Sequence, residues 1–171
     1  MSISPKIRVA VFFGGRSPEH DVSIVSGLQV LKALDPSAYD AFPVYVDLDG
    51  AMRVGAVLQE KGNYLLSPEA LKKTTEVMLD LKASKIGRLV PKKAGLFGSA
   101  KPIEFDVALP VFHGLYGEDG NIQGAFELAG VPYVGTRTMA CSILMDKVAT
   151  KRIQNDLDIP HLPYRVIRRP D

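Results

Sequence analysis

The sequence predicts an α/β fold in which helices cover both faces of a parallel sheet. Predominantly apolar runs at residues 7–13, 41–46 and 106–112 are typical of strands that are buried on both faces. Apolar residues at helical spacing follow the first run, over residues 22–34. A strand, a helix and a second strand in this order predict a right-handed crossover and a three-layer unit.

The first half of the chain is expected to continue this pattern. The helix after the first strand should begin with Asp21 as its N-cap and end near Leu34, before Pro36. Its apolar stripe consists of Val22, Val25, Leu28 and Leu31. The strand at 41–46 should then turn back into a short antiparallel partner at 52–54.

The middle of the chain is less regular. Residues 68–81 are predicted to form an amphipathic helix, with one side made of Leu71, Thr75, Met78 and Leu81. Residues 82–101 contain six basic side chains and no acidic one. This stretch has few aromatic residues and little helical periodicity, so we expect a solvated loop or hairpin rather than a nucleic-acid patch.

The last third should contain two more helices. Residues 121–128 are predicted to be helical, with Asp119 as N-cap candidate, and residues 131–134 to form a short strand. A helix over 139–157 should break near Asp146, and another strand should begin at 164–167.

Composition argues against several classes of protein. The chain has 171 residues, of which 46% are hydrophobic and 23% charged, and a formal net charge of +2. Nothing in this balance points to nucleic acid or to a membrane, and no apolar run reaches transmembrane length. A single cysteine, Cys141, leaves no internal disulfide, and the start of the chain is not a convincing signal peptide. We therefore expect a cytoplasmic protein.

Two strand ends carry the residues best suited to chemistry. The first run ends in Gly14 and is followed by the sequence GRSPEHDVS, in which Glu19 is free to bind a cation such as a substrate ammonium. The third run ends in HGLYGEDG, which begins with His113, a side chain able to hold a carboxylate. Carboxyl ends of parallel strands are where α/β proteins place ligands.

Other ligand types are less well supported. The turn after Gly14 lacks the GxGxxG spacing, and the second strand lacks the acidic end that a dinucleotide site needs. A metal site made of His113, Glu118 and Asp119 is possible, but their spacing does not require one. Lys147 and Lys151 share a helix face, where solvation is the default.

Four linked motifs resemble those of the D-alanine–D-alanine ligases, a family within the ATP-grasp superfamily. In chain order they are GGRSPEHDVSIVSG, HGLYGEDGNIQGAFELAGVPYVG, ACSILMDK and the KxxxxxxxIPxxPY-like stretch at 151–164. The resemblance runs from residue 7 to about residue 167. Cys141 departs from it, because it stands where the family usually has serine.

The resemblance implies roles for individual residues. Glu19 and His113 match the family residues taken as catalytic and substrate-binding, the glutamate toward the ammonium group of the first D-alanine and the histidine toward its carboxylate. Val22 matches a residue of the methyl pocket, and Gly14 is placed at the same substrate site. Lys147 matches a lysine that reaches the phosphates of ATP.

The resemblance also implies an architecture and an activity. Residues 1–136 would form a pre-ATP-grasp, Rossmann-like substrate domain, and residues 137–171 the beginning of an ATP-grasp central domain. The activity would join two D-alanines for peptidoglycan precursors through an acyl phosphate, with ATP and Mg²⁺ or Mn²⁺, in a homodimer.

The resemblance leaves alternatives open. The chain is expected to be truncated and inactive alone, with no metal ligand of its own and the main nucleotide-binding residues beyond residue 171. A ligase that adds D-lactate or D-serine, and a non-catalytic module with the N-terminal fold, are the alternatives.

Overall fold

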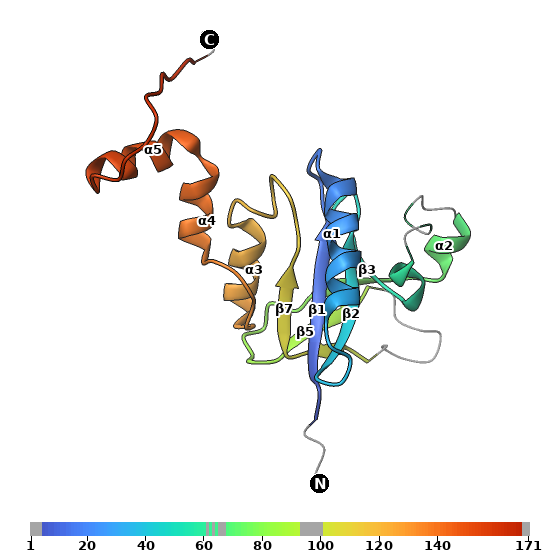
Figure 1. The fold of residues 1–171 in the computed structure, drawn as a ribbon. Coiled ribbons are helices and arrows are strands. Elements are labelled where there is room, and N and C mark those ends of the chain that lie inside the picture. Colours follow the sequence, from blue (N-terminus) through green and yellow to red (C-terminus); the bar gives the residue numbers. More distant parts are fainter. Residues whose placement is uncertain (1–4, 61, 63, 65–67, 93–100, 169–171) are drawn as a thin grey trace.

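The computed structural model describes residues 5–60, 62, 64, 68–92 and 101–168. Within these ranges the chain forms a seven-stranded sheet with α-helices around it (Figure 1). The strands are β1 Ile7–Gly14, β2 Tyr39–Val46, β3 Met52–Val54, β4 Thr75–Leu79, β5 Gly87–Pro91, β6 Ile103–Phe105 and β7 Val107–Pro110. The helices are α1 His20–Ala33, the 3₁₀ turn η1 Ala56–Gln59, α2 Pro68–Lys72, α3 Asn121–Ala129, α4 Thr138–Met145 and α5 Lys147–Asp156.

The sheet is mixed, with its strands in the order β6-β5-β4-β3-β2-β1-β7. The predicted α/β class is confirmed, and parallel pairing is found where β1 lies between β2 and β7. The pairs from β2 to β6 are antiparallel. Close connections favour this arrangement, since parallel neighbours require long crossovers whereas antiparallel neighbours can be joined by a tight turn. At the turn between β2 and β3, for example, the Asp47 N–H donates to the Ala51 carbonyl.

Alternation along β1 builds two separate cores, one on each face of the sheet. Val9, Val11 and Phe13 pack with Ile24 and Leu28 of α1. Figure 1 shows α1 lying along β1 and β2. This face of the sheet is therefore covered by α1.

The opposite face of β1 packs against α3. Ala10 and Phe12 lie in a cluster with Ile122 and Phe126 of α3. The Phe12 ring meets the Phe126 ring edge to face, with 5.0 Å between centroids. Together α1, the sheet and α3 form the three predicted layers.

The prediction of a helix over residues 68–81 is correct only for residues 68–72. α2 covers only Pro68–Lys72, and Thr75–Leu79 forms strand β4. Val77 is buried while Met78 is 53% exposed, which is the alternation of a strand rather than the stripe of a helix. β4 pairs with β3 and β5, and β5 pairs with β6, so pairing with neighbours replaces local helix propensity.

The basic stretch at 82–101 is partly a hairpin. It contains β5, which pairs antiparallel with β4, and residues 93–100 lie outside the described part of the chain.

Several predicted boundaries change. The third strand, predicted over 106–112, is the shorter β7, although backbone hydrogen bonds to β1 flank it, from the Asp106 N–H to the Arg8 carbonyl and from the Val111 N–H to the Phe12 carbonyl. Residues 131–134 pair with β7 through one parallel bridge, Ala108 to Tyr133. The strand predicted at 164–167 is absent, because residues 159–168 have no regular structure or strand partner.

The helical segment after the sheet breaks at Asp146, as predicted. The Asp146 carboxylate accepts from the N–H groups of Val148 and Ala149 and caps α5. α4 lies beside α3, and α5 extends away from the sheet (Figure 1). No helix in the described ranges is long and apolar enough to cross a membrane.

Candidate functional site

Two turns meet at one edge of the sheet. β1 and β7 are neighbouring parallel strands, so the chain leaves both at the same edge, residues 14–19 from one and residues 111–120 from the other. The guanidinium of Arg16 in the first turn lies 4.3 Å from the ring centroid of Tyr116 in the second. The turns singled out from the sequence are therefore in contact.

Glu19 lies at the junction of these turns. It occupies the N-cap position of α1 without a side-chain capping bond, and its own N–H donates to the Ser17 hydroxyl over 3.1 Å. Asp21, the predicted cap, lies instead within the first turn of the helix, which begins two residues earlier than expected. The exposed Glu19 carboxylate is thus free to contact a ligand.

Gly114 allows Glu19 to approach the second turn. A Cβ at this position would overlap Oε2 of Glu19 and Oγ of Ser17, and Gly114 has a φ of +73°. Only glycine combines that backbone conformation with so little space. The carboxylate of Glu19 therefore lies against the residue that follows His113.

His113 is held by the middle of α1. Its Nε2 lies 2.9 Å from the hydroxyl of Ser26, and the imidazole is half-buried. This contact leaves Nδ1 without an assigned partner among the described hydrogen bonds. The histidine thus has one ring nitrogen engaged by the protein and the other available.

Ser23 links the two strand ends. Its buried hydroxyl accepts from the Gly14 N–H at 2.8 Å and donates to the Val111 carbonyl at 2.7 Å. Gly14 has a φ of +93°, and a Cβ there would overlap the Val46 carbonyl. Because the Gly14 N–H is engaged by Ser23, its contribution as a substrate residue stays a prediction.

The acidic residues of the second turn hold its backbone. Glu118 accepts from the Gly114 N–H at 2.7 Å, and Asp119 accepts from Tyr116 and Asn121. Partial burial opposes ionisation of Asp119, but these hydrogen bonds lower its pKa below the ordinary value. Gly120, not Asp119, is the N-cap of α3. Among the described residues, no group of three or more His, Cys, Asp or Glu side chains is placed to hold a metal.

The other two predicted residues lie at different distances from this cluster. Val22 is on α1, one turn after Glu19, and is 54% exposed. Lys147 is exposed at the first position of α5, which stands apart from the sheet (Figure 1). The structure therefore gathers Glu19, Val22 and His113 at one edge and leaves Lys147 outside that group.

A hollow of about 480 Å³ opens on the α3 side of the same turns. It is lined by Gly15, Arg16, Val46, Asp49, Gly50, Met52, Phe112, Tyr116, Asn121, Ile122 and Ala125. Neither Glu19 nor His113 lines it. The predicted substrate residues thus form an open edge on the α1 side, not the floor of this hollow.

A comparison with protein families decides what these turns belong to. The sequence profile of the family described as "D-ala D-ala ligase N-terminus" matches residues 8–136, which include both turns and the sheet edge between them. The chain belongs to this D-Ala-D-Ala ligase N-terminus family.

The curated relatives of this ligase N-terminus are named D-alanine–D-alanine ligases. The D-alanine–D-alanine ligase of Rhodococcus erythropolis is 41% identical over 98% of this chain, and that of Corynebacterium diphtheriae is 40% identical over 93%. The matched regions cover 45% and 42% of those proteins, so the chain spans less than half the length of these relatives.

Solved structures agree on the fold of this ligase N-terminus. The VanG D-Ala:D-Ser ligase from Enterococcus faecalis matches with a TM-score of 0.72 and 27% identity, over 90% of this chain and 43% of that one. The D-alanine-D-alanine ligase from Coxiella burnetii matches with a TM-score of 0.71 and 27% identity, over 91% and 42%.

Three further residues of this ligase N-terminus hold the two turns. His20, Ser23 and Ser26 are spaced by three along α1 and lie along one side of the helix, where each bonds to a strand end or a turn. The signal was present as polar residues that recur every third position beside the apolar residues of the helix. It was hidden because isolated serines in a helix are usually exposed.

Proposed function

We propose that this chain is the first-substrate part of an ATP-dependent D-alanine–D-alanine ligase that supplies peptidoglycan precursors. One observation carries the proposal: at the carboxyl ends of two parallel strands, the free carboxylate of Glu19 lies against Gly114, the residue that follows the available imidazole of His113. The names of the relatives support the choice of substrate.

The arrangement suits a small amino acid. The Glu19 carboxylate receives the ammonium group, and the exposed side chain of Val22, one turn along α1, lies toward the methyl group. Ser26 donates its hydroxyl proton to Nε2 of His113, so that Nδ1 carries the proton and donates to the substrate carboxylate. Glu19 and His113 thereby fix the two charged ends of D-alanine, with Gly14 at the base of the site.

The nucleotide is expected on the side of α5. Lys147 is an exposed cation at the start of this helix, which fits contact with phosphate oxygens. ATP with Mg²⁺, or Mn²⁺, would supply the phosphoryl group that activates the D-alanine carboxylate as an acyl phosphate. We place the remaining nucleotide and metal ligands in the larger share of the relatives' length that this chain does not span. The chain alone is therefore expected to be inactive.

We further propose a cytoplasmic homodimer with D-alanine as its small-molecule partner and no nucleic-acid or membrane partner. Cys141 supports a reducing compartment, since the thiol is buried and free. Burial also raises the pKa of Cys141, which keeps the thiol protonated and unreactive.

One observation favours a second candidate. The VanG D-Ala:D-Ser ligase shares this fold with a TM-score of 0.72, so a ligase that joins D-alanine to D-serine or D-lactate fits the same first-substrate site. The two candidates share the first substrate and differ in the second. Product analysis with D-alanine, D-serine and D-lactate, using the complete ligase that contains this chain, distinguishes them.

Binding of D-alanine to the 171-residue chain tests the proposal. We expect D-alanine, but not L-alanine, to shift the amide NMR signals of Glu19 and His113 in a saturable way. Glu19→Gln should weaken binding at least tenfold, because a neutral amide loses the attraction to the ammonium group. Glu60→Gln, at an exposed glutamate after η1, is the matched control. Equal shifts with both alanine enantiomers, or ADP release by the chain alone, would contradict this proposal.

A further inference from the structure

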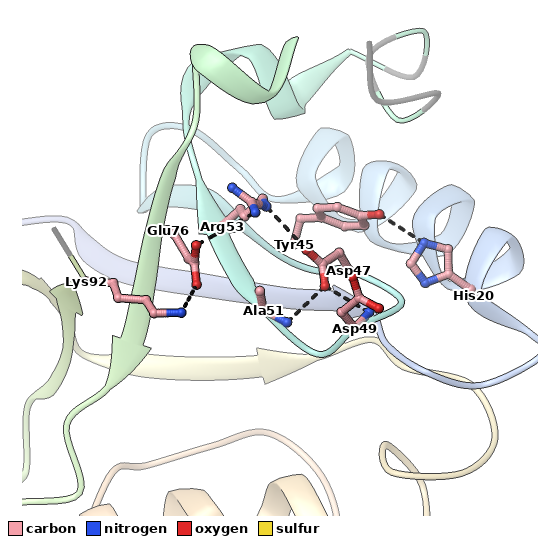
Figure 2. A network of polar contacts seen from close by, with 8 residues as sticks. All are labelled: His20, Tyr45, Asp47, Asp49, Ala51, Arg53, Glu76 and Lys92. Atoms are coloured by element: carbon pink, nitrogen blue, oxygen red, sulfur yellow. Dashed lines mark hydrogen bonds and ion pairs between the residues drawn. The ribbon is translucent and has the colours of Figure 1, made fainter. Parts of the chain in front are cut away.

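We propose that His20 is a positioning residue of the substrate site, which holds the turn carrying Glu19 against strand β2. It follows Glu19 directly and begins α1, and its ring points toward Tyr45 (Figure 2). The inference rests on the proposed function only for the identity of the ligand that the turn binds.

Both ring nitrogens of His20 are engaged by protein groups. Nδ1 lies 2.6 Å from the Gly15 carbonyl oxygen, and Nε2 lies 3.1 Å from the Tyr45 hydroxyl. His20 is 7% exposed and Tyr45 is 1% exposed, so neither side chain can exchange these partners for bulk water. His20 is thus buried behind the turn, not at its open edge.

The partners determine the direction of each hydrogen bond. A carbonyl oxygen can only accept, so Nδ1 of His20 carries the proton that is donated to Gly15. Nε2 of the neutral ring must then accept, and the Tyr45 hydroxyl donates to it. Burial, with the charges of Asp47 and Asp21, raises the pKa of Tyr45 to about 12, which keeps this hydroxyl protonated.

This relay ties the turn to β2 at two places. The Gly15 N–H donates directly to the Val46 carbonyl at 2.8 Å, and the Gly15 carbonyl is tied to Tyr45 through His20. Both β2 residues are buried. With Gly15 held on either side, the chain between Gly15 and α1 has to present Glu19 toward Gly114.

Tyr64 packs beside the hydrogen bonds between Gly15, His20 and Tyr45 without taking part in them. Tyr64 packs edge to face on Tyr45, with ring centroids 5.1 Å apart, but its own hydroxyl donates to the Leu58 carbonyl. Tyr64→Phe therefore removes a tyrosine hydroxyl from the same aromatic cluster without touching the relay. This makes it a matched control for Tyr45→Phe.

NMR of the 171-residue chain labelled at histidine nitrogen tests the relay itself. We expect a neutral His20 ring with the proton on Nδ1, exchanging slowly with solvent, and an Nε2 signal that moves in Tyr45→Phe. A ring protonated on Nε2 instead would overturn the proposal, since the Gly15 carbonyl would then lack its donor.

Two substitutions test whether the relay positions Glu19. Tyr45→Phe keeps the ring and should shift the Glu19 amide signal and raise the Kd for D-alanine about fivefold, the effect of one net hydrogen bond. His20→Asn should raise the Kd further. The double variant His20→Asn with Tyr45→Phe should have nearly the same Kd as His20→Asn, because the two groups act as one unit. Tyr64→Phe should leave the Glu19 signal and the Kd unchanged.

The outcomes separate the two proposals. A wild-type chain that does not bind D-alanine contradicts the proposed function, while the imidazole tautomer and the Glu19 amide still decide the role of His20. Equal effects of Tyr45→Phe and Tyr64→Phe on that amide would reduce His20 to a packing residue and overturn the inference. If His20→Asn fails to fold, Tyr45→Phe with its control decides the question.

Discussion

The hydroxyl of Ser26 lies 2.9 Å from Nε2 of His113, although the two residues come from different elements, α1 and the turn after β7. We expect Ser26→Ala to weaken D-alanine binding about fivefold, because the imidazole loses the partner that orients it. Ser26→Thr, which keeps the hydroxyl, is the control and should bind nearly as well as wild type. Amide NMR titration of the chain measures both, and an unchanged Kd in Ser26→Ala would contradict the role given to this pair.

Gly114→Ala should damage the site more than any change to a contact residue. A Cβ there would overlap Glu19 Oε2 and Ser17 Oγ, and the φ of +73° itself costs an alanine about 1–2 kcal/mol. We expect a lower free energy of unfolding in urea and loss of detectable D-alanine binding.

Gly124→Ala provides the contrast. Gly124 lies inside α3, and its Cβ would only touch Thr138 at 3.7 Å. Alanine is the better helix former, so this change should raise the free energy of unfolding by up to about 1 kcal/mol. Similar losses in Gly114→Ala and Gly124→Ala would show that the crowding at Gly114 is unimportant.

Phe126→Ala should strongly destabilise the sheet face covered by α3. The Phe126 side chain is fully buried between Phe12, at 5.0 Å between ring centroids, and Tyr133, at 5.7 Å. Removing a buried phenylalanine of this kind costs about 3–5 kcal/mol. Leu128→Ala on the same helix removes a 70% exposed side chain and should change the free energy of unfolding by less than about 0.5 kcal/mol.

Stability should fall in acid as the ion pair at the start of β1 is lost. Arg8 donates to Asp106 from Nη2 at 2.7 Å and from its backbone N–H at 2.8 Å, and these hydrogen bonds lower the pKa of Asp106. A carboxyl whose pKa is lower in the folded state stabilises the protein above its ordinary pKa, and this contribution disappears as the pH falls through the lowered value. Asp106→Asn should therefore reduce the urea midpoint at pH 7, with the difference from wild type closing below about pH 4.

Glu104→Gln is the graded control for that experiment. Glu104 contacts Arg8 at 3.3 Å and has a side chain that is 50% exposed. Glu104→Gln should therefore lower the urea midpoint less than Asp106→Asn does. A difference between Asp106→Asn and wild type that persists unchanged at pH 3 would show that the pair contributes through packing rather than charge.

The strongly patterned elements were predictable from the sequence. The run at 7–13 is apolar apart from Arg8, which predicts a strand buried on both faces, and the apolar stripe of α3 fits one of those faces. The stripe predicted for α1 is only partly correct, because Leu28 is buried whereas Val22 and Val25 are exposed. The break at Asp146 was also visible, because an aspartate is a common N-cap. Elements of this kind depend on residues that are close together in the sequence.

The segment at 68–81 shows where local pattern fails. Leu71, Thr75, Met78 and Leu81 fit a helical stripe, yet Thr75–Leu79 forms β4 because β3 and β5 offer it hydrogen-bonding partners on both sides. Strand formation depends on pairing with strands that are distant in sequence, and this pairing cannot be inferred from the segment itself.

The α/β class, the two polar turns and the candidates Glu19 and His113 follow from residue type and short-range order alone. Which groups hold those candidates depends on how the elements pack. Ser26 reaches His113 across 87 positions, Ser23 reaches Val111 across 88, and Tyr45 reaches His20 across 25. A hydrogen bond between residues distant in sequence can form only once the strands lie side by side, which here brings the ends of β2, β1 and β7 close to α1.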